Sequence, residues 1–519
     1  MNIFFRTNYN NKIGIGHIIR CNRLANEFSK LGHNCYFFFD NLNSVRFINY
    51  KSFSLNTKKN VFNELSDARN FCKYTRKIGK GYVIVDDYRL GYSWERFVSK
   101  YHKKVILIDD LNNKEHFSDY IINYNPKNFP EIKYNFSFNK KKGSKFLIHP
   151  NYNIISQKKI IKNYEFKKNF FYITFYIGGG GNLILISKII LSMIQNKNLS
   201  KNIKFLVILG DLAKNKELIK KISKKNKCVE FYEKGDNLYY IIKKTDIFVG
   251  TTGTALFETA FLKTPSILFK ISKNQDTDVF SLENLGHFIF LDYKSINNIK
   301  KISNLIILLS ENYKRLSQLN KNPLIKIDNK GSSRILKNIF SKSLREKIIK
   351  SKKNFTFDKN LKIEKVNDRN INHYLYCRNL NLNRRNSSNN KKITTIDHYN
   401  WWFATQRKSY VLSENGKKIL YFYDEEIALI NKKKYFLSGW FACSTDCSIR
   451  HILFALDWQR RIRKNVIWIS FVNKTNHLAL KYSKYVGWKI LNKNNKVISL
   501  LKQNFNLDIR KFIFFERQA

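Results

Sequence analysis

The first 345 residues alternate between short apolar runs and longer amphipathic segments. A buried strand is expected at Ile3–Phe5. A helix is expected at His17–Leu31, where apolar residues recur at helical spacing and Gly32 provides a C-terminal stop. Strands alternating with helices are typical of parallel sheets covered by helices. Further strands of this first set are predicted at Cys35–Phe39, Tyr82–Val85, Val105–Ile108 and Tyr120–Ile122.

A second alternating set follows a weakly patterned, Asn/Lys-rich stretch at residues 126–168, which is predicted to be a crossover. The pattern predicts an α/β protein of two Rossmann-like domains, residues 1–160 and 161–345, with a cleft between them. The strands of the second set are predicted at Phe170–Ile177, Phe205–Leu209, Val229–Tyr232, Ile247–Val249, Ser266–Phe269 and Phe288–Leu291, and helices at Ile296–Asn320 and Ser332–Phe340.

A charged, Ser-containing run ends this part of the chain, and residues 346–354 are predicted to be a linker. Residues 355–519 are rich in aromatic residues and are expected to form one further α+β domain. Its strands are predicted at Lys417–Tyr423, Ile427–Ile430, Tyr435–Ala442 and Val466–Val472, and its helices at Ile449–Arg463 and Leu478–Val486.

The chain carries 95 Lys and Arg residues against 39 Asp and Glu residues, a formal net charge of +56. A surface that binds a polyanion would explain this charge. However, the enrichment in Lys, Asn, Ile, Phe and Tyr also matches the A/T-rich codons of a low-GC genome, and the lysines are spread over the whole chain. This distribution favours genome composition, and no nucleic-acid partner is expected.

Seven cysteines form no CxxC pair and are odd in number, which predicts neither a disulfide framework nor a metal site. The N-terminus lacks the order of a signal peptide. The uncharged stretch Asn169–Ser187 is long enough to span a bilayer, but glycines interrupt it, so strand–loop–helix is the better interpretation. The sequence therefore predicts a cytoplasmic location without membrane insertion.

The segment Gly14-Ile-Gly16-His17-Ile-Ile-Arg20 opens the first predicted helix. Glycines there allow a ligand to approach the backbone, and a helix N-terminus offers N–H donors to anions. Ile19 stands where a dinucleotide fingerprint needs a third glycine or alanine, which argues against NAD. At a helix N-terminus the His17 imidazole stays neutral and is able to act as a base. The alternative for His17 is a capping role alone.

The segment Gly250-Thr-Thr-Gly-Thr-Ala-Leu-Phe-Glu258 lies between a predicted strand and a helix. Its threonine side chains and backbone amides form a suitable cradle for a diphosphate. Glu258, one turn into the helix, is within reach of ribose hydroxyls. Asn274 and Gln275 follow the next strand, where side-chain amides would reach a sugar or a phosphate. Ordinary turn chemistry and a solvated loop are the alternatives.

Together these motifs, with Asp86-Asp87-Tyr88, Asp109-Asp110, the run Gly178–Gly181 and the segment 328–334, resemble the nucleotide-sugar hydrolases of pseudaminic acid biosynthesis over residues 1–345. The resemblance implies a GT-B fold, like that of the UDP-GlcNAc transferase of peptidoglycan precursor synthesis. It also implies hydrolysis of UDP-2,4-diacetamido-2,4,6-trideoxy-β-L-altropyranose to UDP and free sugar, without a metal or cofactor.

By this resemblance His17 activates water and Tyr88 faces the sugar. The chain departs from the family at Gly181, where an acidic residue is usual, and at Asn8, where aspartate is usual. A GT-B glycosyltransferase, in which an acceptor hydroxyl replaces water and the last domain is not catalytic, is the alternative. The substrate-binding residues implied are Gly14, Gly16, Arg20, Asp86, Gly178, Gly179, Thr251, Thr252, Gly253, Thr254, Glu258, Asn274 and Gln275.

Residues 355–519 resemble GNAT-type N-acetyltransferases. The resemblance rests on Thr395–Phe403, on the strand 435–442 with the helix 449–463, and on Asn476–Trp488. It implies acetyl-CoA as a co-substrate and N-acetylation of a 4-amino sugar in a bifunctional chain. The loop 446–451 lacks the glycines usual around the CoA diphosphate, and Ser483 stands at the usual general-acid tyrosine. The acetyl-CoA site is expected at Ser448, Arg450 and Asn476. Either Tyr482 takes the role of the acid, or acetyl transfer is weakened or lost.

Overall fold

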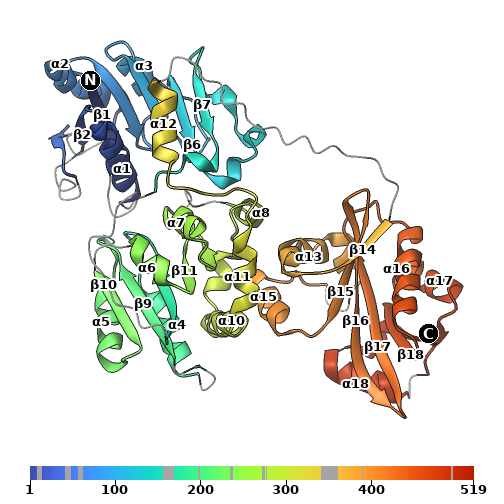
Figure 1. Cartoon of the computed structure of the whole chain (residues 1–519). Helices are drawn as coiled ribbons and strands as arrows, with labels where there is room; N and C mark the ends of the chain where they lie inside the picture. Colours follow the sequence, from blue (N-terminus) through green and yellow to red (C-terminus); the bar gives the residue numbers. More distant parts are fainter. Residues whose placement is uncertain are drawn as a thin grey trace. The chain divides into compact units, whose positions relative to one another are not determined.

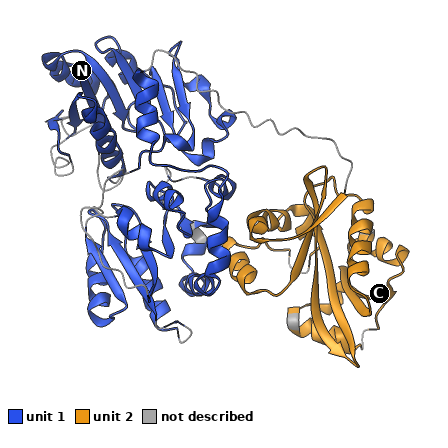
Figure 2. Ribbon diagram, viewed as in Figure 1, with its two compact units in different colours: residues 1–347 blue, residues 348–519 orange. Residues whose placement is uncertain are grey.

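A computed structural model describes the chain except for residues 9–14, 41–47, 56–61, 156–168, 197–198, 201, 234–237, 272–274, 276, 341–360, 388–389, 493–494, 506 and 519. The chain divides into two compact units, residues 1–347 and 348–519 (Figure 2). The predicted linker, residues 346–354, lies outside the described residues.

The first sheet of unit 1 has seven parallel strands in the order β3-β2-β1-β4-β5-β6-β7. Its residues alternate between two cores: Phe4 of β1 packs with helix α2, and Phe5 packs with helix α1. This sheet is therefore buried on both faces, as expected of a parallel sheet. The elements are β1 Asn2–Thr7, α1 Gly16–Lys30, β2 Asn34–Phe39, β3 Lys51–Ser54, α2 Glu64–Ile78, β4 Gly81–Asp86, α3 Tyr92–Val98, β5 Lys104–Ile108, β6 Tyr120–Asn123 and β7 Lys145–Ile148.

The second sheet of unit 1 has six parallel strands in the order β10-β9-β8-β11-β12-β13. The elements are β8 Phe171–Tyr176, α4 Ile184–Ile194, β9 Ile203–Leu209, α5 Lys216–Lys225, β10 Val229–Glu233, α6 Leu238–Lys244, β11 Ile247–Thr251, α7 Ala255–Leu262, β12 Ser266–Phe269, α8 Val279–Glu283, β13 Ile289–Leu291, α9 Tyr293–Ile296, α10 Ile299–Glu311, α11 Tyr313–Lys321 and α12 Gly331–Phe340.

Helix α12 returns from the second sheet to pack against the first (Figure 1). Its last residue, Phe340, stacks on Tyr82 with ring centroids 5.8 Å apart and meets Phe28 edge-on at 5.9 Å. A Cβ atom on Gly331 would lie 1.9 Å from the backbone oxygen of Asn153, so only glycine fits at the start of this helix. Two Rossmann-like domains joined by a returning final helix form the GT-B arrangement that the sequence predicts.

Most predicted elements of unit 1 are confirmed, with differences at edges and within the crossover. The pattern missed the short edge strands β3 and β7. The predicted crossover contains β7 and four 3₁₀ turns, at Pro126–Asn128, Glu131–Lys133, Phe136–Phe138 and Pro150–Tyr152. The helix predicted at Ile296–Asn320 is wrong as a single element, because Asn312 ends α10: its side chain donates to the Leu308 carbonyl at 2.8 Å.

Unit 2 has a seven-stranded sheet in the order β14-β15-β16-β17-β18-β20-β19. The two strands predicted at Lys417–Tyr423 and Ile427–Ile430 are one strand, β16, with a bulge between Glu426 and Ala428. The elements are β14 Leu361–Lys365, a 3₁₀ turn at Asp368–Asn370, α13 Ile371–Arg378, α14 Asn381–Arg384, α15 Thr395–Ala404, β15 Lys408–Glu414, β16 Lys417–Ile430, β17 Lys433–Ala442, α16 Ile449–Ile462, β18 Val466–Asn473, α17 His477–Tyr485, β19 Lys489–Ile490, α18 Lys496–Phe505, a 3₁₀ turn at Ile509–Lys511 and β20 Phe512–Gln518.

Strands β17 and β18 pair in parallel in an otherwise antiparallel sheet. Their register runs from Lys434–Val466 to Leu437–Ile469, although both strands continue beyond it. The strands therefore part over their C-terminal halves. The open space between these strand ends forms a wedge. The sheet, with α16 following β17, is the GNAT-like α+β arrangement that the sequence predicts. Within the described ranges, every helix is too short or too polar to cross a membrane.

Candidate functional site between the two Rossmann-like domains of unit 1

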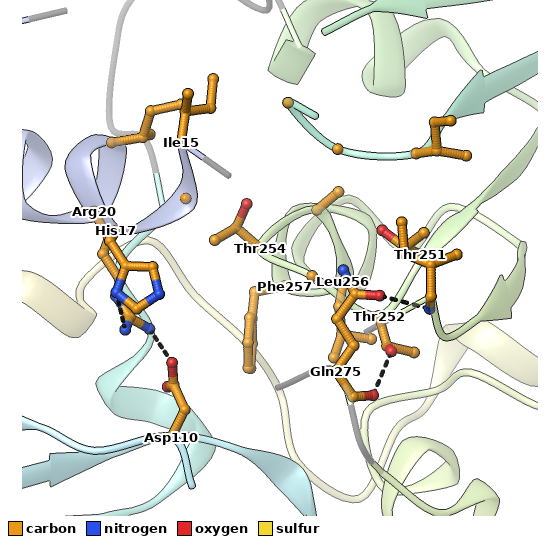
Figure 3. A pocket seen from close by; sticks show the side chains of 18 of the residues that line it. Ile15, His17, Arg20, Asp110, Thr251, Thr252, Thr254, Leu256, Phe257 and Gln275 are labelled. Atoms are coloured by element: carbon orange, nitrogen blue, oxygen red, sulfur yellow. Dashed lines mark hydrogen bonds and ion pairs between the residues drawn. The ribbon is translucent and has the colours of Figure 1, made fainter. Parts of the chain in front are cut away.

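A cavity of about 290 Å³ lies where loops from the two sheets of unit 1 meet. The start of α1, Tyr88, Asp110 and the loop 124–126 form its first side. The glycine run 178–181 and residues 251–257 form the other (Figure 3). Loops that follow parallel strands converge at the carboxyl edge of a sheet, which is where such folds bind ligands. The cavity therefore joins the two motif regions that the sequence singled out.

His17 is the second residue of α1 and is 4% exposed. Its Nδ1 atom lies 2.5 Å from Oδ1 of Asp86, the last residue of β4. Among the residues that the structure describes, its Nε2 atom has no hydrogen-bond partner. The carboxylate therefore fixes Nδ1 as the protonated nitrogen and leaves Nε2 free to accept a proton. Asp86, and not the helix end alone, controls this ring.

Arg20, one turn further along α1, holds the carboxylates around His17 together. Its Nε and Nη2 atoms donate to Asp86 at 2.7 and 2.5 Å, and Nη1 lies 2.7 Å from Asp110. Although burial alone would raise it, the charge of Arg20 and the hydrogen bonds from Arg20 and His17 hold the pKa of Asp86 well below its usual range. Asp86 is therefore ionised throughout the neutral range, and Arg20 is engaged before any ligand binds.

Tyr88 lies edge-on to the His17 ring, with centroids 4.5 Å apart. Its hydroxyl donates to Oδ2 of Asp110 at 2.6 Å, and burial next to this carboxylate raises the pKa of Tyr88 well above its usual value. The phenol thus stays protonated and restrains the imidazole. Asp110 and Tyr124 complete this cluster, and sequence reasoning did not select them. The Asp109-Asp110 pair after a strand was the available signal for Asp110.

The other side of the cavity consists of closely approaching backbone. A Cβ atom on Gly179 would lie 2.3 Å from the Ile15 side chain, and Gly178 has φ +83°. The glycine run therefore touches the segment that opens α1. At Gly181, where the resembling family carries an acid, a Cβ atom would lie 2.5 Å from the Ile177 side chain. The Asn8 amide donates to Asp40 at 2.5 Å, a contact that an aspartate at position 8 would turn into repulsion.

The loop before α7 is organised by Thr252 and Gln275. The Thr252 hydroxyl donates to the Gln275 carbonyl at 2.8 Å, and the Gln275 side-chain oxygen accepts from the Ile271 amide at 3.0 Å. Thr254, the N-cap residue of α7, makes no side-chain cap. The Leu256 and Phe257 amides of α7 donate to the Gly253 and Thr254 carbonyls at 3.1 and 3.2 Å. The Ala255 amide, which opens the helix, has no hydrogen-bond partner within the described residues, so it is available to an anion in the cavity.

Four predicted substrate-binding residues are not placed in this cavity. Asp86 is fully buried, bonded to His17 and Arg20, and does not line the cavity. Glu258 is 1% exposed and does not line it; its Oε1 atom accepts from Arg23 at 2.7 Å. The second oxygen, Oε2, is buried and has no hydrogen-bond partner within the described residues. Gly14 and Asn274 lie outside the described residues. Gly16 lines the cavity with nothing within 4 Å of its Cβ position, so the space for a ligand is open there.

The predicted acetyl-CoA residues of unit 2 have structural roles in the described contacts. Ser448 and His451 form a capping box at the start of α16, and Arg450 is paired with Glu414. Asn476 caps α17 by accepting from the Ala479 amide at 3.2 Å. The Tyr482 hydroxyl is buried without a partner among the described residues, and burial raises its pKa to about 12. Among the predicted acetyl-CoA and acid residues, Tyr482 is thus the one whose buried hydroxyl has no partner within the described residues.

The helix α15, which carried the GNAT resemblance, supplies core side chains. His398 is buried, its Nε2 atom lies 2.9 Å from the Ile371 carbonyl, and burial lowers its pKa to about 4. Trp402 donates from its indole to Asp368 at 2.8 Å. These contacts join α15 to the start of α13 and to the 3₁₀ turn before it, so these two side chains support the fold.

Comparison with known proteins gives one family model and one curated protein that match part of the chain. The model of the glycosyltransferase family 28 C-terminal domain matches residues 174–337, which include the glycine run and the loop before α7. An uncharacterized protein of Methanocaldococcus jannaschii is 26% identical over 285 residues, 52% of this chain and 55% of that protein. The match thus spans about half the length of this curated relative.

Three solved structures resemble parts of the chain. Two of them cover about two thirds of it and the third covers about one third. MurG of Acinetobacter baumannii is 9% identical with a TM-score of 0.46, over 65% of this chain and 99% of that one. UDP-GlcNAc 2-epimerase of Neisseria meningitidis is 13% identical with a TM-score of 0.43, over 65% and 99%. An N-acetyltransferase of Staphylococcus aureus is 12% identical with a TM-score of 0.24, over 31% and 98%.

Proposed function

We propose that unit 1 is a hydrolase that releases UDP from a UDP-2,4-diacetamido-2,4,6-trideoxy-hexose, the sugar nucleotide of pseudaminic acid biosynthesis. The observation that carries the proposal is one cavity with the His17–Asp86 pair on one side and the loop 251–254 with the start of α7 on the other. A base facing an anion cradle is what hydrolysis of a nucleotide sugar requires. The family 28 match over residues 174–337 supports a nucleotide-sugar enzyme.

In this mechanism the diphosphate lies against the amides of the loop 251–254 and the Ala255 amide at the start of α7. Nε2 of His17 takes a proton from water, and the water oxygen bonds to the anomeric carbon of the sugar. The bond between that carbon and the diphosphate oxygen breaks, and its electron pair leaves with UDP. Asp86 stabilises the imidazolium, and the amides stabilise the departing charge. Glu258 would turn its unpartnered Oε2 atom toward the ribose.

We further propose that unit 2 transfers acetyl from acetyl-CoA to the 4-amino group of the same sugar series. The space between the unpaired ends of β17 and β18 would hold the pantetheine arm of CoA. The Tyr482 hydroxyl, which has no partner within the described residues, would donate a proton to the departing CoA thiolate. A GT-B glycosyltransferase with a non-catalytic second unit is the other candidate. The same base would serve it, with an acceptor hydroxyl in place of water.

Product analysis separates these functions. The intact chain is incubated with UDP-2,4-diamino- and diacetamido-trideoxy sugars, with and without acetyl-CoA, and the products are identified by mass spectrometry. We expect UDP and free sugar without any added acceptor, and an acetyl mass increase only when acetyl-CoA is present. UDP release that depends on an added acceptor would contradict the hydrolase proposal and support the glycosyltransferase.

Gly253→Ala should weaken UDP binding without destabilising the chain. A Cβ atom there would lie 3.6 Å from the Gln275 side chain, which is ordinary contact, so the fold has room for it. The same methyl group would enter the diphosphate site and disturb charge-assisted hydrogen bonds of about 1.5–3 kcal/mol each. We expect the Kd for UDP, measured by calorimetry, to rise about 10- to 100-fold.

Gly250→Ala is the matched control for this variant. Its Cβ atom would lie 2.4 Å from the Tyr176 backbone oxygen, so it should lower stability by about 1–3 kcal/mol. If Gly253→Ala bound UDP as tightly as the unaltered chain, the diphosphate would not lie against this loop.

A further inference from the structure

His373 and Cys377 stand one helical turn apart on α13, so both side chains point from the same face of the helix. Cys443 follows the last residue of β17 directly. The structure brings one ligand atom from each of these three residues within 4.8 Å of one another. Cys377 is fully buried and Cys443 is 8% exposed, so this cluster lies inside unit 2.

The distances between the Cys377 thiol and the His373 imidazole fit tetrahedral zinc. The Cys377 Sγ atom lies 3.6 Å from Nδ1 and 3.8 Å from Nε2 of His373. With Zn–S near 2.3 Å and Zn–N near 2.0–2.1 Å, ligand atoms of a tetrahedral site are about 3.5–3.8 Å apart. Two thiols and an imidazole are also ligands that zinc prefers.

A second contact orients the imidazole. The Tyr421 hydroxyl of β16 lies 2.9 Å from Nδ1 of His373, and Tyr421 is fully buried. Histidine ligands of metals usually engage a protein group through the other ring nitrogen, which fixes the tautomer. Here that partner on Nδ1 leaves Nε2 for the metal.

The two cysteines lie against each other. The Cys377 thiol donates to the Cys443 carbonyl, with Sγ and oxygen 3.9 Å apart. Zinc binds cysteine as the thiolate, so metal binding would release the thiol protons.

We propose that His373, Cys377 and Cys443 bind one zinc ion, with the fourth position taken by water. The ion would tie α13 to the loop 443–448 between β17 and α16. This is the glycine-free loop in which the GNAT resemblance expects the CoA diphosphate, so the metal would hold a loop that lacks the usual backbone cradle. The cysteine spacing predicted no metal site, because the ligands come from segments 66 residues apart that the fold alone brings together. The inference is independent of the function of unit 1.

The test is the metal content of the intact chain. Protein freed of metal with a chelator is incubated with zinc, desalted and measured by plasma mass spectrometry. We expect close to one zinc per chain, and at least a fivefold loss of it in Cys377→Ser and in Cys443→Ser. Cys228→Ser, a partly exposed cysteine in unit 1, is the matched control and should keep the metal.

Cobalt keeps the proposal testable if a serine variant fails to fold. The metal-free unaltered chain titrated with Co²⁺ should develop the visible bands of tetrahedral cobalt and a thiolate-to-cobalt charge-transfer band, saturating near one equivalent. The proposal would be overturned by octahedral cobalt spectra without charge transfer, or by fewer than about 0.2 zinc per chain. It would also be overturned by an unchanged zinc content in a folded Cys377→Ser/Cys443→Ser double variant. So would a Cys377–Cys443 disulfide in non-reducing peptide maps of the freshly purified chain.

Discussion

His17→Ala is expected to lower the rate of UDP release by about 10²- to 10⁴-fold, the usual contribution of a general base. Nε2 of His17 is the nitrogen left free by the 2.5 Å contact of Nδ1 with Asp86, and it faces the cavity. The loop 251–254, which is proposed to bind the diphosphate, lies on the other side of that cavity, so the Kd for UDP should change by only a few-fold. Steady-state kinetics and UDP calorimetry on the same preparation measure both effects.

Two further variants make this result specific. Asp86→Asn keeps the shape of the site but removes the carboxylate that fixes the His17 tautomer, so the rate should fall by about 10²-fold or more. His477→Ala, on the exposed start of α17 in unit 2, removes a histidine that the proposed hydrolysis does not use and should leave the rate unchanged. Undiminished turnover in His17→Ala would show that another group, or no protein base, activates the water.

Arg6→Met is expected to have the largest effect on stability. Arg6 is fully buried on β1 and donates to both oxygens of Asp67, at 3.1 and 2.7 Å, and to Asp40 at 2.7 Å. Its removal leaves Asp67, which is also fully buried, without a cation. Breaking a buried ion pair in this way costs about 3–5 kcal/mol, because the remaining charge is uncompensated.

Hydrogen exchange of the intact chain measures this loss within unit 1. The free energy of opening at the amides of β1 and β4 should fall by about 3–5 kcal/mol, whereas amides of unit 2 should be unaffected. Arg69→Met, an exposed arginine on the same helix as Asp67, is the control and should stay within about 0.5 kcal/mol. If Arg6→Met behaved like the control, water would have to reach Asp67 in the folded chain.

The sequence pattern predicted most elements of unit 1, because the apolar patterns of strands and helices are set by residues close together in the sequence. Buried parallel strands read as apolar runs, so Ser266–Phe269 was predicted with the bounds of β12. Edge strands carry a weaker signal, because one side has no neighbouring strand and the residues there are partly polar, as in β3 and β7. In unit 2 the bulge in β16 interrupts the alternation, and the single strand was therefore predicted as two.

The loops of the candidate site were also predictable from the sequence. Glycine and threonine motifs directly after buried strands place their backbone at one edge of a parallel sheet, whatever the order of the strands. This is why the segments that begin at His17 and Thr251 line one cavity, as the motifs indicated.

The partners of the charged side chains were not predictable. Glu258 is paired with Arg23 across 235 residues, and His373 meets Cys443 although they lie on separate elements. Periodicity and motifs are properties of neighbouring residues, so the amino-acid order alone determined the elements and the loops that approach a ligand. Which carboxylate orients His17, and which thiols approach His373, depends on strand order and helix packing. These contacts join residues far apart in the chain, and only the folded structure brings them within a few ångströms.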